Sequence, residues 1–361
     1  MSKLEEARKI INDVDSQMAK LFEKRMEAAK LVAEYKKEHA LSILDEAREK
    51  EVIAKNSQMV EDSVVREYYI QFLKDTMKVS RDYQSRLNYG MKVAYSGVPG
   101  AFAYIAAKRM FPEATLVSYS NFDEAYKAAE NGECDSVVLP IENSFAGDVG
   151  TVMDLLFSGS LYVNQIIDLG IEHNLIACDG ASLDTVKTVV SHEQALSQCK
   201  EYLNARGYET QVYPNTALAA KYVKELNDPT VAAVASDETA AIFGLKILAG
   251  KIHTSKTNTT RFAAFSRTKK DAAKGRKSNE NFILVFTVKN EAGALAKTLD
   301  IIGAHGYNMR NLRSRPMKEL MWSYYFYIEA EGNINSEDGR DMLTELGATC
   351  DRLKLAGTYY L

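Results

Sequence analysis

Two cations in the first predicted helix lie where apolar side chains are expected. Apolar residues between positions 11 and 35 recur at alternating spacings of three and four, which predicts one long amphipathic helix. Arg25 occupies a position in this apolar seam, and Lys36 lies one residue past another. Because a helical turn takes about 3.6 residues, both side chains return to nearly one face. We expect a pocket for a small dianion, although two snorkelling side chains with packed stems would give the same pattern.

Two further helical stretches offer polar groups. The second begins with Asp45, Arg48 and Glu49, and the third carries Ser80 and Gln84 one turn apart. Residues four apart share a helix face. We therefore expect polar side chains from three helices to meet in one pocket.

This arrangement resembles the all-helical chorismate mutases that begin bifunctional P-proteins. The resemblance covers residues 1 to about 88 and rests on Arg8, Asp15, Arg25, Lys36, Asp45, Arg48, Glu49, Ser80 and Gln84, in that order. It implies an entwined helical dimer in which each first helix lends Arg8 to its neighbour's site.

The implied reaction is the rearrangement of chorismate to prephenate, which needs no nucleophile, proton transfer or cofactor. Orientation and charge must then supply the rate. The resemblance implies that Arg25 and Arg8 clamp the two carboxylates of chorismate. It also implies that Lys36 and Gln84 face the ether oxygen, where negative charge grows as its bond to carbon breaks.

The remaining mutase residues are expected to orient the ring. Asp45 and Glu49 would hold the ring hydroxyl, Ser80 would contact a carboxylate, and Arg48 would support Asp45.

Composition allows more than one domain and excludes several classes of protein. A chain of 361 residues is expected to form two or three domains. A net charge of -4 offers no basic stripe for nucleic acid. Four dispersed cysteines and five histidines predict neither a metal site nor a disulfide framework. The charged first helix is not a signal peptide, and no apolar run is long enough to span a membrane, so we expect a soluble cytoplasmic protein.

From Met91 onward the pattern changes to short β-rich runs alternating with helices, which predicts an α/β fold. The polar segment 85–91 is expected to contain the boundary. The turn at 97–103, GVPGAFA, could present backbone amides to an anion. It is not the glycine pattern of a dinucleotide site, so the alternative of a fused prephenate dehydrogenase lacks a place for its cofactor.

Six ordered motifs in residues 92 to about 267 resemble prephenate dehydratase. They are GVPGAFA, PIENS, SHEQAL, NTALAA, ASDETAA and NTTRF. The family fold has two α/β lobes, like those of a type II periplasmic binding protein, with the active site in the cleft. The resemblance implies one lobe from 92–167 with 247–267, and a second from 168–246.

Prephenate dehydratase removes carbon dioxide and the ring hydroxyl together, so the enzyme must help hydroxide to leave. The resemblance assigns this task to Thr260, whose weakly acidic hydroxyl would stabilise the departing oxygen or relay a proton. Asn143, Ser144 and Thr216 would complete a polar cradle, and Phe262 would form a wall against the ring.

Arg261 is a candidate for binding a substrate carboxylate, and a structural ion pair is the alternative. The chain departs from the common family pattern at Ala103 and Tyr104, where many relatives carry serine and histidine, and at Asn215, where serine is frequent. We therefore expect the 97–103 turn to bind through its backbone or to matter less.

A polar segment, 268–280, reads as a linker. The following stretches predict a β-α-β-β-α-β order: 282–289, 293–304, 308–315, 321–330, 337–346 and 353–361. This order is ferredoxin-like. It resembles the phenylalanine-sensing ACT domain of prephenate dehydratases through EAGAL at 291–295 and RSRP at 313–316, with Trp322 downstream.

The ACT resemblance implies L-phenylalanine as a feedback effector. The residues it assigns to this site are Gly293, Ala294, Leu295, Asn308, Ser314 and Arg315. Arg313 stands where relatives usually carry glutamate, which leaves the affinity and identity of the effector open.

Together these resemblances imply a bifunctional enzyme with a mutase at 1–88, a dehydratase at 92–267 and an ACT domain at 281–361. Its ligands would be chorismate, prephenate and L-phenylalanine, with no cofactor, metal, nucleic acid or membrane. An exposed apolar seam predicts a homodimer or tetramer. The alternatives are a mutase with a silent dehydratase-like module that responds to an amino acid, and a binding protein with a decayed site.

Overall fold

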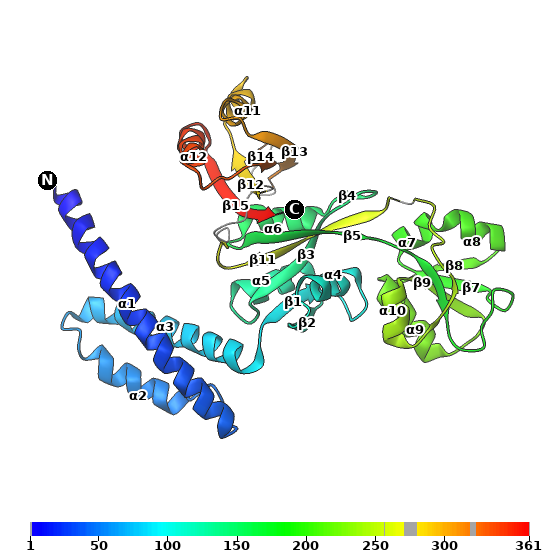
Figure 1. Cartoon of the computed structure of the whole chain (residues 1–361), viewed down its shortest axis with the longest axis horizontal. Coiled ribbons are helices and arrows are strands. Elements are labelled where there is room, and N and C mark those ends of the chain that lie inside the picture. Colours follow the sequence, from blue (N-terminus) through cyan, green and yellow to red (C-terminus); the bar gives the residue numbers. More distant parts are fainter. Residues whose placement is uncertain (1, 256, 271–279, 318–322, 361) are drawn as a thin grey trace. The chain divides into compact units, whose positions relative to one another are not determined.

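The structure, a computed structural model, describes residues 2–255, 257–270, 280–317 and 323–360 (Figure 1). The chain divides into two compact units, residues 1–91 and 92–361. The predicted strand residues Met321 and Trp322 and most of the predicted 268–280 linker lie outside the described residues. Among the described helices, none combines the length and the apolar character needed to cross a bilayer.

The first unit consists of three helices, as predicted. They are α1 (Lys3–Glu38), α2 (Glu46–Ser57) and α3 (Ser63–Tyr89). A capping box between Ser2 and Glu5 begins α1, and the Asp45 side chain caps α2 by accepting a bond from the backbone of Arg48. Each helix therefore starts where a short polar side chain satisfies its free backbone amides.

The apolar seam of α1 stays largely open within one chain. Only Ala29 and Ala33 of this helix are buried, whereas the Ile11 and Leu21 side chains remain exposed. A seam of this size lacks a covering partner in the single chain.

The second unit begins with an α/β lobe whose sheet is mostly parallel at one side. Strand β1 (Lys92–Ser96) lies between β2 (Thr115–Tyr119) and β3 (Ser136–Asn143). Two later strands extend the sheet: β11 (Thr259–Ser266) pairs antiparallel with β3, and β5 (Tyr162–Gly170) pairs antiparallel with β11. Strand β4 (Gly147–Asp148) pairs with the end of β3. The covering helices are α4 (Phe102–Met110), α5 (Phe122–Glu130) and α6 (Gly150–Ser158).

A second sheet forms the other lobe, in the strand order β10-β6-β9-β7-β8. The strands are β6 (Asn174–Ala177), β7 (Thr188–Ser191), β8 (Glu209–Val212), β9 (Val231–Ala235) and β10 (Lys246–Ala249). The helices are α7 (Glu193–Gln198), α8 (Lys200–Arg206), α9 (Thr216–Leu226) and α10 (Asp237–Phe243). The boundaries between the lobes differ slightly from the expected ones. Strand β10 pairs with β6 and therefore belongs to the second lobe, whereas β5 continues to Gly170 in the sheet of the first lobe.

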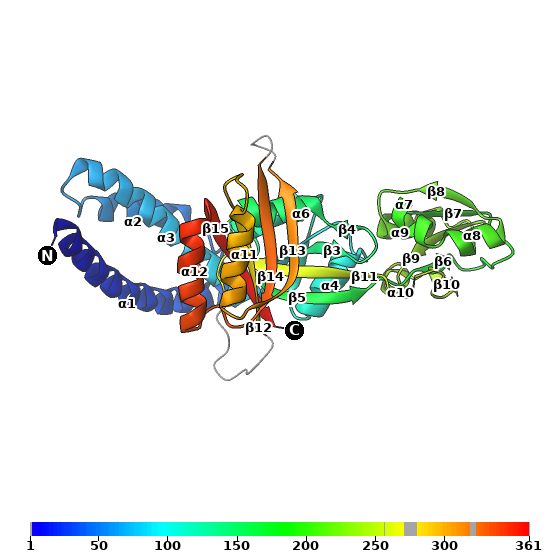
Figure 2. The same cartoon turned by 90° about the horizontal axis from the view of Figure 1, so that it is seen from above.

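The C-terminal segment has the predicted β-α-β-β-α-β order. Its elements are β12 (Glu280–Thr287), α11 (Ala294–Ala304), β13 (Asn308–Pro316), β14 (Tyr324–Glu331), α12 (Glu337–Thr349) and β15 (Arg352–Tyr360). Helices α11 and α12 lie side by side on one face of these strands (Figures 1 and 2). The predicted fold class, a helical unit followed by two α/β lobes and an α+β segment, is confirmed.

The C-terminal strands continue the sheet of the first lobe, which the sequence did not predict. Strand β15 runs parallel to β5 and meets it at Gly357 and Val163. A Cβ atom on Gly357 would lie 2.1 Å from the Val163 carbonyl oxygen, so only glycine permits this approach.

Replacing Gly357 by alanine should push β15 away from β5 and lower the free energy of unfolding by about 1–3 kcal/mol. Differential scanning calorimetry would measure the change. Gly347→Ala is the matched control, because a Cβ there meets no atom within 4 Å and alanine favours a helix by roughly 0.5–1 kcal/mol. Equal melting temperatures for the two variants would contradict this account of the strand contact.

Candidate active sites

The three helices of the first unit enclose a pocket with charged walls. The described side chains that could bind a ligand there are Arg25, Lys36, Asp45, Arg48, Glu49, Ser80, Arg81 and Gln84. Seven of the eight predicted mutase residues are in this set. Arg8 is the exception, because it lies exposed on the N-terminal part of α1 and does not line the pocket.

The cations of α1 are held by oxygen atoms of the same unit. Arg25 donates to the Ser80 hydroxyl and, at 3.4 Å, to the Thr76 carbonyl. Partial burial lowers the pKa of Arg25. Lys36 donates to the Ile43 carbonyl. Oxygen atoms of neutral groups thus orient both cations without neutralising them.

Asp45 and Arg48 interact differently from the expectation. The Asp45 carboxylate accepts a bond from the backbone N–H of Arg48 at 3.0 Å. The Arg48 guanidinium turns outward to Glu51, 2.7 Å away, and its side chain is 64% exposed. The hydrogen bond from Arg48 to Asp45 is therefore made by its backbone.

Arg81 is a pocket residue that the sequence reasoning missed. Its guanidinium forms an ion pair with Glu49, and both side chains are partly buried. The available signal was its position next to Ser80, on the edge of the same helix face. Gln84 is also buried, and its Oε1 atom has no hydrogen-bond partner among the described residues.

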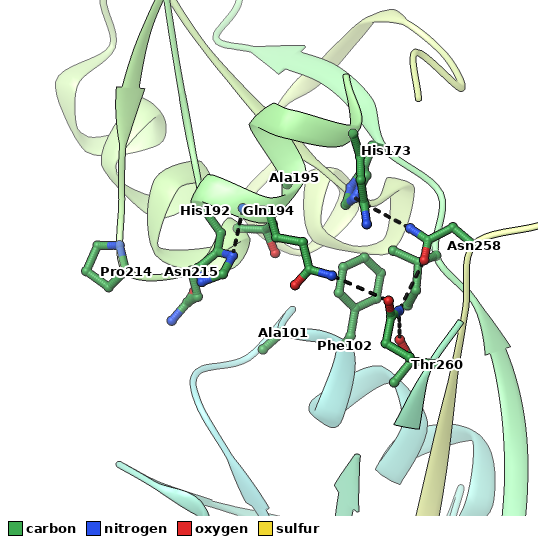
Figure 3. Close-up of a pocket in the computed structure, with 14 residues that line it drawn as sticks. Ala101, Phe102, His173, His192, Gln194, Ala195, Pro214, Asn215, Asn258 and Thr260 are labelled. Carbon is green, nitrogen blue, oxygen red and sulfur yellow. Dashed lines mark hydrogen bonds between the residues drawn. The ribbon is translucent and has the colours of Figure 1, made fainter. Parts of the chain in front are cut away.

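A second pocket, of about 250 Å³, lies between the two α/β lobes (Figure 3). The first lobe and the segments that connect the two lobes contribute Ala101, Phe102, Asn143, Ile171, His173, Asn258 and Thr260. The second lobe contributes His192, Gln194, Ala195, Gln198, Pro214, Asn215 and Thr216. These fourteen described residues include no lysine, arginine, aspartate or glutamate. The polar residues of this lining are therefore amides, hydroxyls and imidazoles.

Asn143 and Thr260 face each other across neighbouring strands and form a hydrogen bond. The side-chain oxygen of Asn143, Oδ1, accepts hydrogen bonds from the backbone amides of Phe145 and Ala146 at 3.0 and 2.9 Å. This pair of donors determines the amide orientation, so the Asn143 NH₂ group donates to the Thr260 hydroxyl at 2.8 Å. Since Thr260 accepts there, its own proton is left to donate elsewhere.

A chain of amides continues from Asn143 to a buried histidine. Asn143 donates to the Asn258 side chain at 3.1 Å, and Asn258 donates to Gln198 at 2.9 Å. His173 Nε2 lies 2.8 Å from the same Gln198 oxygen, so it is the protonated ring nitrogen. Burial lowers the pKa of His173 to about 4, which keeps the ring neutral at neutral pH.

The three partners in this chain were not assigned roles from the sequence. Asn258 could have been found, because residues two apart share a strand face and Asn258 precedes Thr260 by two. Gln198 and His173 are distant from the motif in sequence and come to it only through the fold.

Two helix starts also face the pocket. Ala101 precedes α4 without a capping side chain, and Asn215 caps α9 by accepting from the Leu218 amide at 2.7 Å. Thr216 is the first residue of α9. Helix N-termini carry partial positive charge. Ala103 and Tyr104 do not line the pocket, whereas the Phe102 ring lies edge-on to His173.

Three predicted dehydratase residues lie outside this pocket. The Ser144 hydroxyl bonds to the Thr257 carbonyl and the Thr259 amide, both at 3.0 Å. Phe262 is fully buried and does not line the pocket, so Phe102 is the aromatic side chain at its wall. Strand alternation turns Arg261 away from the side that carries Thr260.

Arg261 forms ion pairs on that other side of the sheet. Its guanidinium lies 2.9 Å from Glu329 and 3.5 Å from Glu142. Arg261 thus forms a structural ion pair, which was the alternative to binding a substrate carboxylate.

Sequence comparisons match the two units to known enzyme families. Residues 7–85 match the chorismate mutase type II family, and residues 93–270 match the prephenate dehydratase family. A bifunctional chorismate mutase/prephenate dehydratase of Neisseria gonorrhoeae is 30% identical over 362 residues, which cover 98% of this chain and 95% of that protein.

Solved structures resemble the second unit. A prephenate dehydratase from Arthrobacter aurescens in complex with L-Phe gives a TM-score of 0.69 at 26% identity, covering 75% of this chain and 90% of that one. GqqA, described as a novel type of quorum quenching acylase, gives 0.68 at 28% identity, covering 74% and 97%.

The match to the bifunctional enzyme extends over both units, and each family model falls on the unit that contains the corresponding pocket. The chain therefore belongs to the bifunctional chorismate mutase/prephenate dehydratases of phenylalanine biosynthesis, and it catalyses both reactions.

Proposed function

We propose that the helical pocket binds chorismate through Arg25 and through Arg8 of the partner subunit, one arginine for each carboxylate. Lys36 and Gln84 would then meet the ether oxygen as its charge grows, because preorganised donors stabilise developing charge strongly. Gln84 supports this role because it is buried in the pocket and carries an amide NH₂ group that can donate to that oxygen.

Glu49 and Asp45 are proposed to hold the ring hydroxyl, and Ser80 to contact a carboxylate together with Arg25. The hydrogen bond between Arg25 and Ser80 supports a shared ligand for these two side chains. Arg48 is proposed to act only through its backbone bond to Asp45.

A homodimer, or a tetramer built from it, follows from the same proposal. The open seam of α1, including Ile11 and Leu21, supports a second copy as the covering partner. Domain bounds of 1–88, 92–267 and 281–361 are part of this proposal. So is a cytoplasmic location, which the four unpaired cysteines support.

The shared site predicts complementation between two inactive proteins. Arg8→Ala and Arg25→Ala should each lose most mutase activity, because each removes one carboxylate partner. A mixture under subunit exchange should recover about one quarter of the parent activity, since half the dimers are mixed and each of these has one intact site. Spectrophotometric loss of chorismate measures this. A mixture no more active than its components would refute the shared site.

The lobe pocket is proposed to bind prephenate with its ring hydroxyl against Thr260. The bond from Asn143 to Thr260 carries this proposal, because it leaves the threonine proton free to stabilise the departing oxygen. The loss of carbon dioxide supplies the electron pair that makes the ring aromatic as hydroxide leaves. A threonine is too weak an acid to transfer its proton outright, so it acts as a hydrogen-bond donor.

The two carboxylates of prephenate are proposed to lie at the starts of α4 and α9. The uncapped backbone at Ala101 and the Thr216 hydroxyl support this placement, because helix N-termini favour anions. Phe102 would pack against the ring and exclude water. Ser144, Arg261 and Phe262 would support the site from outside the pocket.

Thr260→Ala should lower the dehydratase kcat by about 10²–10³, as expected for losing one donor to a developing oxyanion. In a time course with chorismate alone, prephenate should accumulate in the variant while the parent forms phenylpyruvate. Thr259→Ala is the matched control, because its side chain points to the opposite face of β11.

Prephenate accumulation in the parent as well would instead favour the alternative of a mutase with a silent dehydratase-like module. Unchanged phenylpyruvate formation by Thr260→Ala would contradict the role given to this hydroxyl.

L-phenylalanine is proposed as a feedback effector of the C-terminal segment. The similar Arthrobacter enzyme was solved with L-Phe, and its match covers most of the second unit. The proposed site uses the backbone at the start of α11, at Gly293, Ala294 and Leu295, and the exposed Asn308 and Ser314 side chains. Arg315 would contribute indirectly, because its guanidinium lies 3.4 Å from Asp154 of α6.

L-phenylalanine should therefore inhibit phenylpyruvate formation, and Asn308→Ala should raise the half-inhibiting concentration roughly fivefold to tenfold, the equivalent of one hydrogen bond. Dehydratase rates measured across an L-phenylalanine titration test this, with L-tyrosine as the comparison ligand. Rates that do not respond to L-phenylalanine in the parent would rule out this effector.

A further inference from the structure

A partly buried cluster of charges joins the C-terminal strands to the two strands that carry the dehydratase pair. We call Glu142, Arg261, Arg313 and Glu329 the bridging cluster. Arg313 lies 2.6 Å from Glu142, and Arg261 lies 2.9 Å from Glu329 and 3.5 Å from Glu142. Two residues come from β3 and β11, and two come from β13 and β14.

The bridging cluster lies directly behind the proposed catalytic pair. Glu142 immediately precedes Asn143, and Arg261 immediately follows Thr260. In the strand register, Thr260 faces Asn143 and Arg261 faces Glu142. Because successive side chains point to opposite faces of a sheet, the cluster holds the same two strand ends from the other side.

On the β14 side of the cluster, Glu329 is shielded from solvent and both of its carboxylate oxygens have hydrogen-bond partners. Glu329 is only 2% exposed, and it accepts hydrogen bonds from the hydroxyls of Tyr327 and Tyr359. Burial acts to lower the pKa of Arg261, but the charge and hydrogen bond of Glu329 outweigh it and raise that pKa. Breaking a buried pair leaves an uncompensated charge, which is costly.

The β13 side adds a second cation. The Arg313 side chain is 14% exposed, and it pairs with Asp148 of β4 as well as with Glu142. Burial acts to raise the pKa of Glu142, yet Arg313 and then Arg261 outweigh it, so that pKa lies below its ordinary value. Arg313 therefore links both strands of the β3–β4 turn, which contains the Phe145 and Ala146 amides that orient Asn143.

We propose that Arg313 and Glu329 are positioning residues of the dehydratase: they hold β3 and β11 so that Asn143 keeps its hydrogen bond to Thr260. The inference rests on the proposed role of Thr260. Neither residue is in the lining of the lobe pocket. Displacement of a reacting group by about 1 Å can cost roughly 10² in rate, so a small shift of either strand would matter.

Other cations attach the C-terminal segment to the first lobe without contacting β3 or β11. Arg352 donates to the Phe157 carbonyl at 3.1 Å and lies over the Phe157 ring. This contact is made with α6 and not with β3 or β11. Arg352 thus offers a matched control for Arg313, with the same side chain joining the same two parts of the unit.

The test compares Arg313→Met with Arg352→Met in the full chain. Dehydratase kcat and KM for prephenate, mutase rates and calorimetric unfolding are measured on the same samples. Arg313→Met should lower the dehydratase kcat roughly tenfold to hundredfold with KM changed less than about threefold. Mutase rates should stay unchanged, Arg352→Met should keep the parent kcat, and Arg313→Lys should recover part of the loss.

Equal kcat values for Arg313→Met and Arg352→Met would overturn the proposal, as would a loss confined to KM. If Arg313→Met does not fold, Glu142→Gln carries the test, because it preserves shape and removes the charge that Arg313 holds. A normal kcat in that variant would then overturn the proposal. Failure of the Thr260 role is seen separately, as normal dehydratase activity in Thr260→Ala.

Discussion

The hydrogen bond from the Asn143 amide to the Thr260 hydroxyl is the interaction on which the arrangement of the second unit depends. It requires two strands that are 117 residues apart in the sequence to be in register. It also requires an amide of defined orientation, which the Phe145 and Ala146 amides provide. The tight turn after β3 and the amide chain to His173 both serve this one contact. A neutral His173 suits that chain, because a buried charge there would have no counterion in the pocket lining.

The two pockets present different kinds of groups to a ligand. The mutase pocket uses formal cations, Arg25 and Lys36, on a partly open helical surface where the cost of desolvating a charge is small. The lobe pocket presents helix N-termini, amides and hydroxyls, with no formal charge among its described lining residues. Preorganised donors suit a reaction in which hydroxide must leave, because they stabilise the negative charge that develops on the departing oxygen.

The C-terminal segment is part of the dehydratase sheet and not only an appendage. Strand β15 reaches β5 through Gly357, and the bridging cluster connects β13 and β14 to β3 and β11. The C-terminal segment is therefore in direct contact with the strands that carry Asn143 and Thr260. Arg313 makes one of these contacts. In the sequence, its presence where relatives usually carry glutamate bore only on the identity of the effector.

The sequence by itself determined the order and type of the elements, and it identified the residues with local signals. The α1 helix, the β-α-β-β-α-β order and the motifs around Asn143 and Thr260 all depend on periodicity or short spacing, which a single sequence displays. The tertiary structure decided which neighbours share a site. It brought Gln198 and His173 to Asn258 and turned Arg261 away from the pocket. It also placed Phe102, and not the predicted Phe262, at the pocket wall, and it paired Arg81 with Glu49. These outcomes depend on strand register and side-chain direction between distant segments, and local sequence patterns do not encode the distances that such contacts require.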